Sequence, residues 1–169
     1  MNSPRAMVIV SGGQTGADRA ALDFALRHGF PHRGWCPAGR LAEDGRLEDC
    51  YRLQETPSPA YAQRTEWNVR DSDGTVIFTC HAELSGGTLF TWECARKLGR
   101  PVLVLVAGQT PSPARALRAF LRRHRIRVLN VAGPRASFAP GIGAFVEAVL
   151  SEALLPRRKA GLPPSAARQ

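Results

Sequence analysis

The sequence lacks the features that would assign it to several broad classes of protein. No apolar run approaches the ~20 residues that a membrane-spanning helix needs, and the polar stretch from Met1 to Met7 has no signal-peptide core. We therefore expect a cytoplasmic protein without membrane contact. The four cysteines form no C-x-x-C pair, and no histidine stands at the spacing of a zinc site. We therefore predict no metal site built from the protein's own side chains.

The composition is that of a globular domain. The chain has 169 residues, of which 44% are hydrophobic, and this is enough to bury a sizeable core. We predict a single domain over residues 1–155. A basic, disordered tail is expected over residues 156–169, which contain a Pro-Pro pair and several small residues.

The net charge of +9 invites a nucleic-acid-binding hypothesis. Much of this charge falls on one predicted helix and its exit, over residues 115–127, and on the tail. A solvated helix face together with a basic tail is the interpretation we favour. Aromatic residues make up only 7% of the chain, and no aromatic-rich surface for stacking bases is evident. Nucleic-acid binding stays open as an alternative.

Short apolar runs alternate with amphipathic segments along the chain. Their patterns predict strands at residues 7–11, 75–79, 101–106 and 127–131, and helices at residues 17–28, 58–71, 88–98, 110–121 and 140–154. Such alternation is typical of an α/β fold in which helices cover both faces of a mainly parallel sheet. Residues 34–45 are rich in glycine, proline and charge, so we expect an irregular loop there, either a lid over a site or an ordinary surface loop.

Three glycine-containing loops fall at the carboxyl ends of the predicted strands. Ligands of open parallel sheets bind at this edge, where helix N-termini and free backbone N–H groups attract anions. A phosphate is therefore the expected guest, although the first loop matches neither a Walker loop nor a complete G-x-G-x-x-G motif. The simpler alternative is a set of tight, capped turns. The candidate binding residues are Gly12, Gly13, Gln14, Thr15, Gly16, Asp18, Arg19, Gly86, Gly87, Thr88, Gly133 and Arg135.

A polar cluster runs from a predicted helix into the following strand. It contains Arg64, Glu66, Asn68, Asp71 and Asp73. Some of these side chains must form a solvated helix face, and we expect one or two to reach the ligand pocket. The two aspartates can instead cap the turn around residue 74.

Four motifs together resemble one known family. They are Ser11–Ala21, Gly34–Pro37, Arg64–Asp71 and Leu129–Arg135. The chain resembles, over about residues 7 to 150, the family named putative molybdenum carrier proteins. This family is the circularly permuted YpsA branch of the SLOG superfamily of Rossmann-like ligand-binding domains, so the resemblance implies a Rossmann-like three-layer α/β/α fold with circularly permuted SLOG topology.

The permutation follows from the order of the motifs. Related SLOG domains, such as the DprA type, have a Gly-Ser-Arg-like loop first and a Ser-Gly-Gly-x-x-Gly-x-Asp loop second. In this chain Ser11–Asp18 resembles the second loop and comes first, whereas Val131–Arg135 resembles the first loop and comes last. The resemblance therefore implies that these two segments are neighbours in space.

The function implied by the resemblance is that of a binding or carrier protein for a phosphorylated, nucleotide-like small molecule. The expected cofactor is molybdenum cofactor (molybdopterin), a nucleotide or an ADP-ribose-like molecule, and relatives indicate a homo-oligomer. One alternative is a nucleotide-processing hydrolase, because Ser85–Thr88 resembles part of the Pro-Gly-Gly-x-Gly-Thr-x-x-Glu pattern of LOG-type phosphoribohydrolases. Glu93, Glu66 or Asp18 would then be catalytic, but Ser85 replaces the proline and the second Gly-Thr pair is missing.

Overall fold

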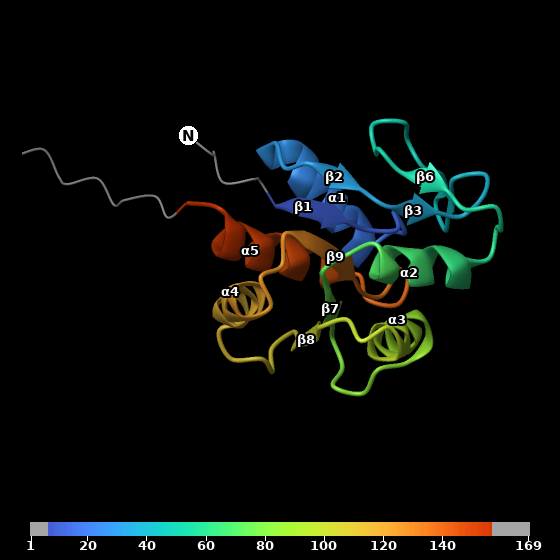
Figure 1. Cartoon of the computed structure of the whole chain (residues 1–169). Coiled ribbons are helices and arrows are strands. Elements are labelled where there is room, and N and C mark those ends of the chain that lie inside the picture. Colours follow the sequence, from blue (N-terminus) through green and yellow to red (C-terminus); the bar gives the residue numbers. More distant parts are fainter. Residues whose placement is uncertain (1–6, 157–169) are drawn as a thin grey trace, which may run out of the picture.

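The computed structural model describes residues 7–156 (Figure 1). The predicted tail beyond Pro156 lies outside the described residues. Over the described part, strands and helices alternate as the sequence pattern predicts, except that five short strands, β2 to β6, lie between α1 and α2, where the sequence predicted none.

Five strands form the central sheet, and every neighbouring pair in it is parallel. In spatial order they are β2 (His32–Arg33), β1 (Val8–Val10), β9 (Val128–Ala132), β7 (Gly74–Thr79) and β8 (Val102–Val106). All six residues of β7 are buried, as expected of an inner strand that is covered on both faces. The predicted α/β fold with a mainly parallel sheet is confirmed.

The helices cover both faces of this sheet (Figure 1). Helices α1 (Ala17–His28), α4 (Pro113–Arg123) and α5 (Ile142–Leu154) pack side by side on one face. Helices α2 (Tyr61–Arg70) and α3 (Gly86–Lys97) pack together on the other. The connections that lead from one strand to the next in the direction of β8 pass over the face covered by α2 and α3. Those that lead in the direction of β2 pass over the face covered by α1 and α4, as the right-handed connection rule requires.

The segment between β2 and α2 is more regular than the sequence predicts. β3 (Trp35–Cys36) pairs in parallel with β6 (Gln54–Glu55), and β4 (Leu41–Ala42) pairs antiparallel with β5 (Gly45–Arg46). The expectation of an irregular loop over residues 34–45 is therefore wrong in part. A small apolar cluster orders the segment, and its members are Leu22, Cys36, Leu47, Tyr51 and Leu53.

Two helices begin later than their Ser-Pro and Thr-Pro pairs predict. α2 begins at Tyr61, because the Ser58 hydroxyl accepts a hydrogen bond from the Ala60 amide (3.0 Å) and closes a turn instead of capping the helix. α4 begins at Pro113, because the Thr110 hydroxyl accepts from the Val106 amide (2.7 Å) at the end of β8. α3, by contrast, begins at Gly86, two residues before the predicted start.

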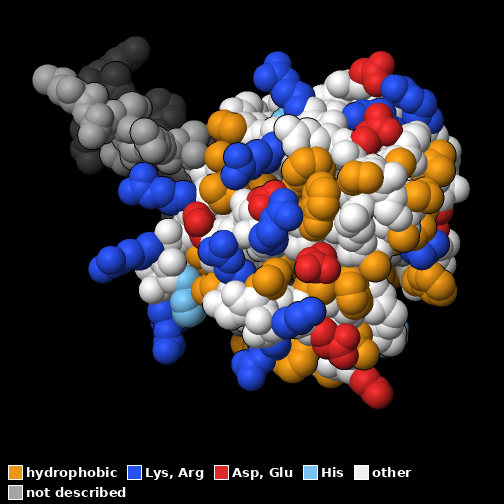
Figure 2. Space-filling view, turned by 45° about the vertical axis from the view of Figure 1, so that its right-hand side comes forward, with side chains coloured by type: hydrophobic (Ala, Val, Ile, Leu, Met, Phe, Trp, Pro, Cys, Tyr) orange, Lys and Arg blue, Asp and Glu red, His pale blue; other side chains and the backbone are white. Residues whose placement is uncertain are grey.

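α4 has the amphipathic pattern that its sequence predicts. Its buried residues are Ala114, Leu117, Phe120 and Leu121, whereas its arginines lie on the outer side. Figure 2 shows that Lys and Arg side chains predominate toward one side of the molecule, while acidic side chains are interspersed over the rest of that face. The solvated helix face is thus observed, and its arginines lie outside the cavity described below.

The first and last strands of the chain are direct neighbours. Ile9 of β1 pairs with Leu129 of β9, and the Ser11 hydroxyl donates to the Val131 carbonyl oxygen at 2.8 Å. Beyond the strands, the Ala17 amide donates to the Pro134 carbonyl oxygen at 3.2 Å. The adjacency that the motif order implies is therefore present.

We expect Gly133→Ala to destabilise the protein, because this glycine allows the close packing of three elements. A Cβ at position 133 would lie 2.5 Å from the Cβ of Ala17 and 2.6 Å from the carbonyl oxygen of Phe78. The expected loss is about 1–3 kcal/mol of unfolding free energy, measured by denaturant titration. Gly87→Ala is the control, since its Cβ would meet nothing within 4 Å and alanine favours a helix. Equal stability of the two variants would contradict the packing argument.

Candidate functional site

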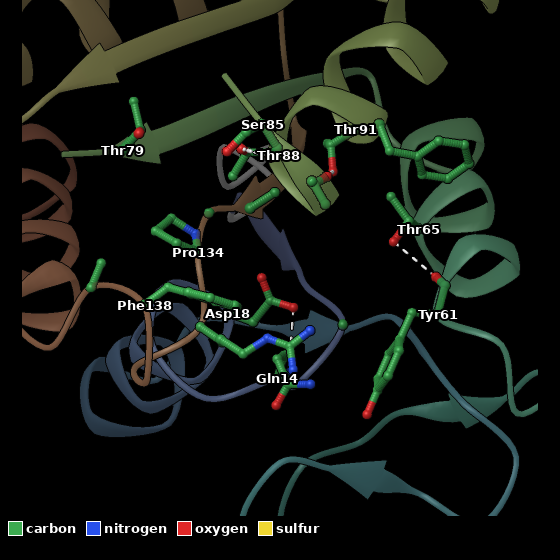
Figure 3. Close-up of a pocket in the computed structure, with 18 of the residues that line it drawn as sticks. Gln14, Asp18, Tyr61, Thr65, Thr79, Ser85, Thr88, Thr91, Pro134 and Phe138 are labelled. Atoms are coloured by element: carbon green, nitrogen blue, oxygen red, sulfur yellow. Dashed lines mark hydrogen bonds between the residues drawn. The ribbon is translucent and has the colours of Figure 1, made fainter. Parts of the chain in front are cut away.

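A cavity of about 650 Å³ opens at the carboxyl edge of the sheet (Figure 3). Its walls come from four segments: the loop after β1, the first turns of α2, the loop after β7 with the start of α3, and the loop after β9. The volume lies within the range of small-molecule sites, which is roughly 300–1,000 Å³.

The topology explains why the cavity forms at this place. After β9 the chain turns to α5 on one face of the sheet, and after the neighbouring strand β7 it turns to α3 on the other face. The two loops therefore diverge and leave a crevice between them, which is where open α/β sheets bind ligands.

The start of α3 is the part of the wall most suited to an anion. Ser85 is the N-cap residue, and the amides of Thr88 and Leu89 both donate to its carbonyl oxygen, at 3.2 and 3.3 Å. The amides of Gly86 and Gly87 come before these in the first turn, where a helix offers no acceptor of its own. The first turn of α3 contains no acidic residue, and the nearest carboxylate that lines the cavity before it is that of Glu83, two residues ahead of Ser85.

Glycine keeps this helix start open. Gly86 has φ of +51°, and a Cβ added at either Gly86 or Gly87 would meet nothing within 4 Å. Thr88 lies beside them, but its hydroxyl donates to the Ser85 carbonyl oxygen at 2.7 Å instead of capping the helix. A ligand can therefore approach the backbone closely here.

The loop after β1 differs from the phosphate cradle that the sequence predicts. Its amides at Gln14 and Thr15 donate to the side chains of Asp18 (3.4 Å) and Gln14 (3.0 Å), and the Ala17 amide donates to the loop after β9. These donors are therefore already used inside the protein. The loop supplies Gly12, Gln14 and Asp18 to the cavity wall, and it does so mainly through side chains.

A buried ion pair connects this loop to α2. Arg64 Nη1 lies 2.7 Å from Asp18 Oδ2, and the side chains are only 14% and 5% exposed. A Cβ on Gly12 would lie 1.6 Å from Arg64 Nη1, so the guanidinium occupies the space that this glycine leaves. Arg64 Nε is buried without a hydrogen-bond partner among the described residues, and Arg64 lines the cavity.

We expect Asp18→Asn to be strongly destabilising, because it leaves the Arg64 charge buried without its partner. Removal of one member of a buried pair costs about 3–5 kcal/mol. The matched control is Asp44→Asn, which breaks the more exposed Arg19–Asp44 pair (3.0 Å) and is expected to cost about 1 kcal/mol or less. Chemical denaturation of both variants at pH 7 checks the difference, and similar losses would contradict it.

The segment with β4 and β5 contacts the loops after β1 and β9, but it does not line the cavity. The Glu43 carboxylate accepts hydrogen bonds from the hydroxyls of Thr15 and Ser137 (2.7 Å for the latter), and the Glu43 amide donates to Gln14. Arg19 pairs with Asp44 and donates to the Gly13 carbonyl oxygen. The segment therefore holds the two loops together from outside, and the lid interpretation gains no support.

Hydrogen bonds from Ser137 and then Thr15 hold the pKa of Glu43 below its ordinary value of 4.5. The depressed pKa means that this contact stabilises the fold above pH 4.5 and is lost as the pH falls through the lower, folded-state pKa. We expect Glu43→Gln to exchange amide hydrogens faster than the wild type over residues 40–47 at pH 7.

The rate ratio of the two proteins should approach one as the pH falls below about 4.5, since protonated Glu43 resembles glutamine. Comparing the proteins at each pH cancels the intrinsic pH dependence of exchange. A ratio that stays constant with pH would show that the Glu43 carboxylate does not hold this segment.

The structure brings eight of the predicted binding residues to the cavity and leaves the others outside it. Those that line the cavity are Gly12, Gln14, Asp18, Gly86, Gly87, Thr88, Gly133 and Arg135. Gly13, Thr15, Gly16 and Arg19 lie behind the wall, in contacts with neighbouring loops. Glu66 and Glu93, the carboxylates of the hydrolase alternative, are exposed and do not line the cavity.

The side chains that line the cavity from α2 were predicted only in part from the sequence. Tyr61, Arg64, Thr65 and Asn68 line the cavity from α2, and the spacing of three, four and seven residues places them on one helix face. That register is a signal that sequence reasoning could have used. We expected one or two members of the polar cluster over residues 64–73 to reach the pocket, and Arg64 and Asn68 do line it. Phe138, in the loop after β9, has no such signal.

Two further properties concern the described residues 7–156. No helix in this range has the length and apolarity needed to cross a membrane. No group of three or more His, Cys, Asp and Glu side chains in the same range is placed to hold a metal ion.

This combination of a permuted parallel sheet and an edge cavity is that of a SLOG-type domain. The chain belongs to the circularly permuted YpsA SLOG family, whose model matches residues 9–154. No curated protein matches the chain significantly.

A solved structure is closely similar to this chain. It is described as a putative molybdenum carrier protein from Syntrophus aciditrophicus, shares 44% sequence identity and has a TM-score of 0.86, with 91% of this chain and 98% of that chain covered. A pyrimidine reductase-like protein from Corynebacterium diphtheriae, at 13% identity and a TM-score of 0.25 over 83% of this chain and 55% of that one, is too distant to inform the fold or the function.

Proposed function

We propose that the protein binds or carries a phosphate-bearing, nucleotide-like small molecule in the edge cavity. The observation that carries this proposal is the start of α3, where Gly86 and Gly87 open into the cavity in a first turn without acidic residues. A helix N-terminus of this kind binds phosphate through its backbone N–H groups and its dipole.

Two arginines at the cavity support an anionic guest. Arg135 lines the wall from the loop after β9, and its side chain is 39% exposed, so it can turn toward a bound phosphate. Arg64 lines the wall from α2, is paired with Asp18, and has a buried Nε–H without a partner in the part of the chain that the structure describes. These donors lie on elements other than α3, so the phosphate would be bound from more than one side.

The name of the Syntrophus relative makes molybdenum cofactor, a phosphorylated pterin, the first ligand to consider. A nucleotide or an ADP-ribose-like molecule offers the same phosphate to the same backbone amides. The residues that would hold the phosphate of any of these are Gly86, Gly87, Thr88 and Arg135.

Native mass spectrometry of the purified protein, together with its denatured extract and its molybdenum content, tests the proposal. We expect a co-purifying phosphorylated pterin or nucleotide, and molybdenum with it if the ligand is the cofactor. An empty protein that also gains no thermal stability from nucleotides, ADP-ribose, pterin phosphates or inorganic pyrophosphate would overturn the proposal.

Gly87→Asp separates phosphate binding from folding. Aspartate in the first turn stabilises a helix by about 0.3–1 kcal/mol, whereas its charge repels a phosphate at the same helix start. We therefore expect unchanged or higher stability and at least about tenfold weaker binding of pyrophosphate or ADP by isothermal titration calorimetry. Gly87→Ala controls for added bulk, and Arg123→Gln on α4 controls for altered net charge. Undiminished binding by Gly87→Asp would place the phosphate elsewhere.

No specific observation favours the other candidate functions. Glu66 and Glu93, two of the carboxylates named for the hydrolase alternative, are exposed and do not line the cavity. Asp18, the third, lines the cavity and is paired with Arg64. The arginines of α4 keep nucleic-acid binding open, but they do not contact the cavity. Self-association and a cytoplasmic location stay predictions.

A further inference from the structure

Two exposed aromatic side chains stand at the cavity, and the ring of one of them, Tyr61, also lies 5.7 Å from the guanidinium carbon of Arg64. Tyr61, at the start of α2, is 40% exposed, and Phe138, in the loop after β9, is 76% exposed. Both line the cavity, and they lie on opposite sides of Gln14 and Asp18 (Figure 3). A phenylalanine with three quarters of its surface exposed contributes little to the core, and the observation of interest is that two exposed aromatic rings share one cavity.

The backbone holds Phe138 in a defined place. The amides of Phe138 and Ala139 both donate to the carbonyl oxygen of Arg135, each at 3.1 Å, which closes a tight turn. Ala139 is buried against the core at 8% exposure. The ring of Phe138 is therefore presented to the cavity by a fixed turn. Tyr61 is equally well placed, because it belongs to the first turn of a helix.

A flat group already lies beside both of these rings. The guanidinium carbon of Arg135 lies 5.4 Å from the ring centre of Phe138 and 5.9 Å from that of Tyr61. The guanidinium is planar and stacks on aromatic faces. The geometry therefore accepts a planar group flanked by two aromatic side chains.

The space beside Tyr61 and Phe138 and the start of α3 are separate parts of one cavity. Ser85 and Thr88 lie on one side of the cavity in Figure 3, whereas Tyr61 and Phe138 flank the opposite part. A ligand with a phosphate at one end and a flat ring at the other would use both parts.

We propose that Tyr61 and Phe138 form a stacking slot for the planar heteroaromatic ring of the ligand, beside or in place of the Arg135 guanidinium. This inference depends on the proposed function, since the ring is part of the molecule whose phosphate binds at α3. The slot explains an exposed aromatic pair that the phosphate site alone does not, and it restricts the ligand to molecules in which a phosphate is joined to a flat ring system, such as a nucleotide or a pterin.

Calorimetric titration with ring-bearing and ringless probes tests the slot. The ring-bearing probes are ADP and 6-hydroxymethylpterin diphosphate, and the ringless probe is inorganic pyrophosphate. We expect at least one ring-bearing probe to bind the wild type about tenfold or more tightly than pyrophosphate. Phe138→Ala and Tyr61→Ala should each remove about tenfold of that affinity and leave pyrophosphate binding unchanged.

Because both side chains are well exposed, their truncation is not expected to unfold the protein, and thermal denaturation verifies this. Phe138→Trp keeps a flat ring and should restore binding of the ring-bearing probe. Leu26→Ala, at an apolar position on α1 that lies outside the cavity and is about as exposed as Tyr61, should leave it unchanged.

The outcomes distinguish the two proposals. Equal affinity of all three probes, or alanine variants that bind like the wild type, would overturn the slot and leave the phosphate site standing. Failure of all three probes to bind the wild type would overturn the proposed function and the slot together. A change of oligomeric state in Phe138→Ala, seen by size-exclusion chromatography with ring binding intact, would assign Phe138 to a contact between copies and overturn the slot.

Discussion

The close approach of two loops that are far apart in sequence is the constraint on which the site depends. The loop after β1 and the loop after β9 are joined by the hydrogen bonds Ser11–Val131 and Ala17–Pro134. Gly16 and Gly133 permit this contact, since a Cβ at Gly16 would lie 2.5 Å from the Pro134 carbonyl oxygen and one at Gly133 equally close to the Cβ of Ala17. If the loops separated, β1 would lose its position beside β9, and Asp18 and Arg135 would no longer face one cavity.

Because of this close approach, most glycines of the loop after β1 serve packing between segments and not contact with a ligand. In the loop after β1 a phosphate cradle and a tightly packed turn have the same sequence signature, because both need positive φ and small side chains. The structure uses Gly12, Gly13 and Gly16 for packing against Arg64, two leucines and the neighbouring loop. At the start of α3, by contrast, the space in front of Gly86 and Gly87 is open. Glycine-rich motifs thus locate the edge of the sheet, but only the neighbours of each glycine decide which of them can face a ligand.

The fold and the region of the site followed from local patterns in the sequence, while the finer assignments did not. Alternating apolar strands and amphipathic helices are local signals, and they predicted the parallel sheet and the edge where the cavity opens. The adjacency of β1 and β9 is a long-range property that came from the family resemblance. Burial of the Asp18–Arg64 pair and exposure of Phe138 depend on how four segments meet in space, so no local pattern could predict them. Glu93 illustrates the same limit: its place on α3 was predicted, but the side of the helix that faces the cavity was not.

The permuted chain order is compatible with this site because the site depends on spatial neighbours and not on their covalent order. A parallel ladder needs the register of Ile9 with Leu129 and of Gly74 with the same Leu129, whichever strand the chain forms first. The ligand-facing groups likewise come from strand ends that are adjacent in the sheet and remote in the sequence. What permutation does change is the separation of the paired strands in the sequence: β1 and β9 form the most non-local strand pairing in the described chain, and non-local pairing is associated with slow folding. The ion pair between Asp18 and Arg64 and the hydrogen bonds of Glu43 connect the loops that this pairing brings together.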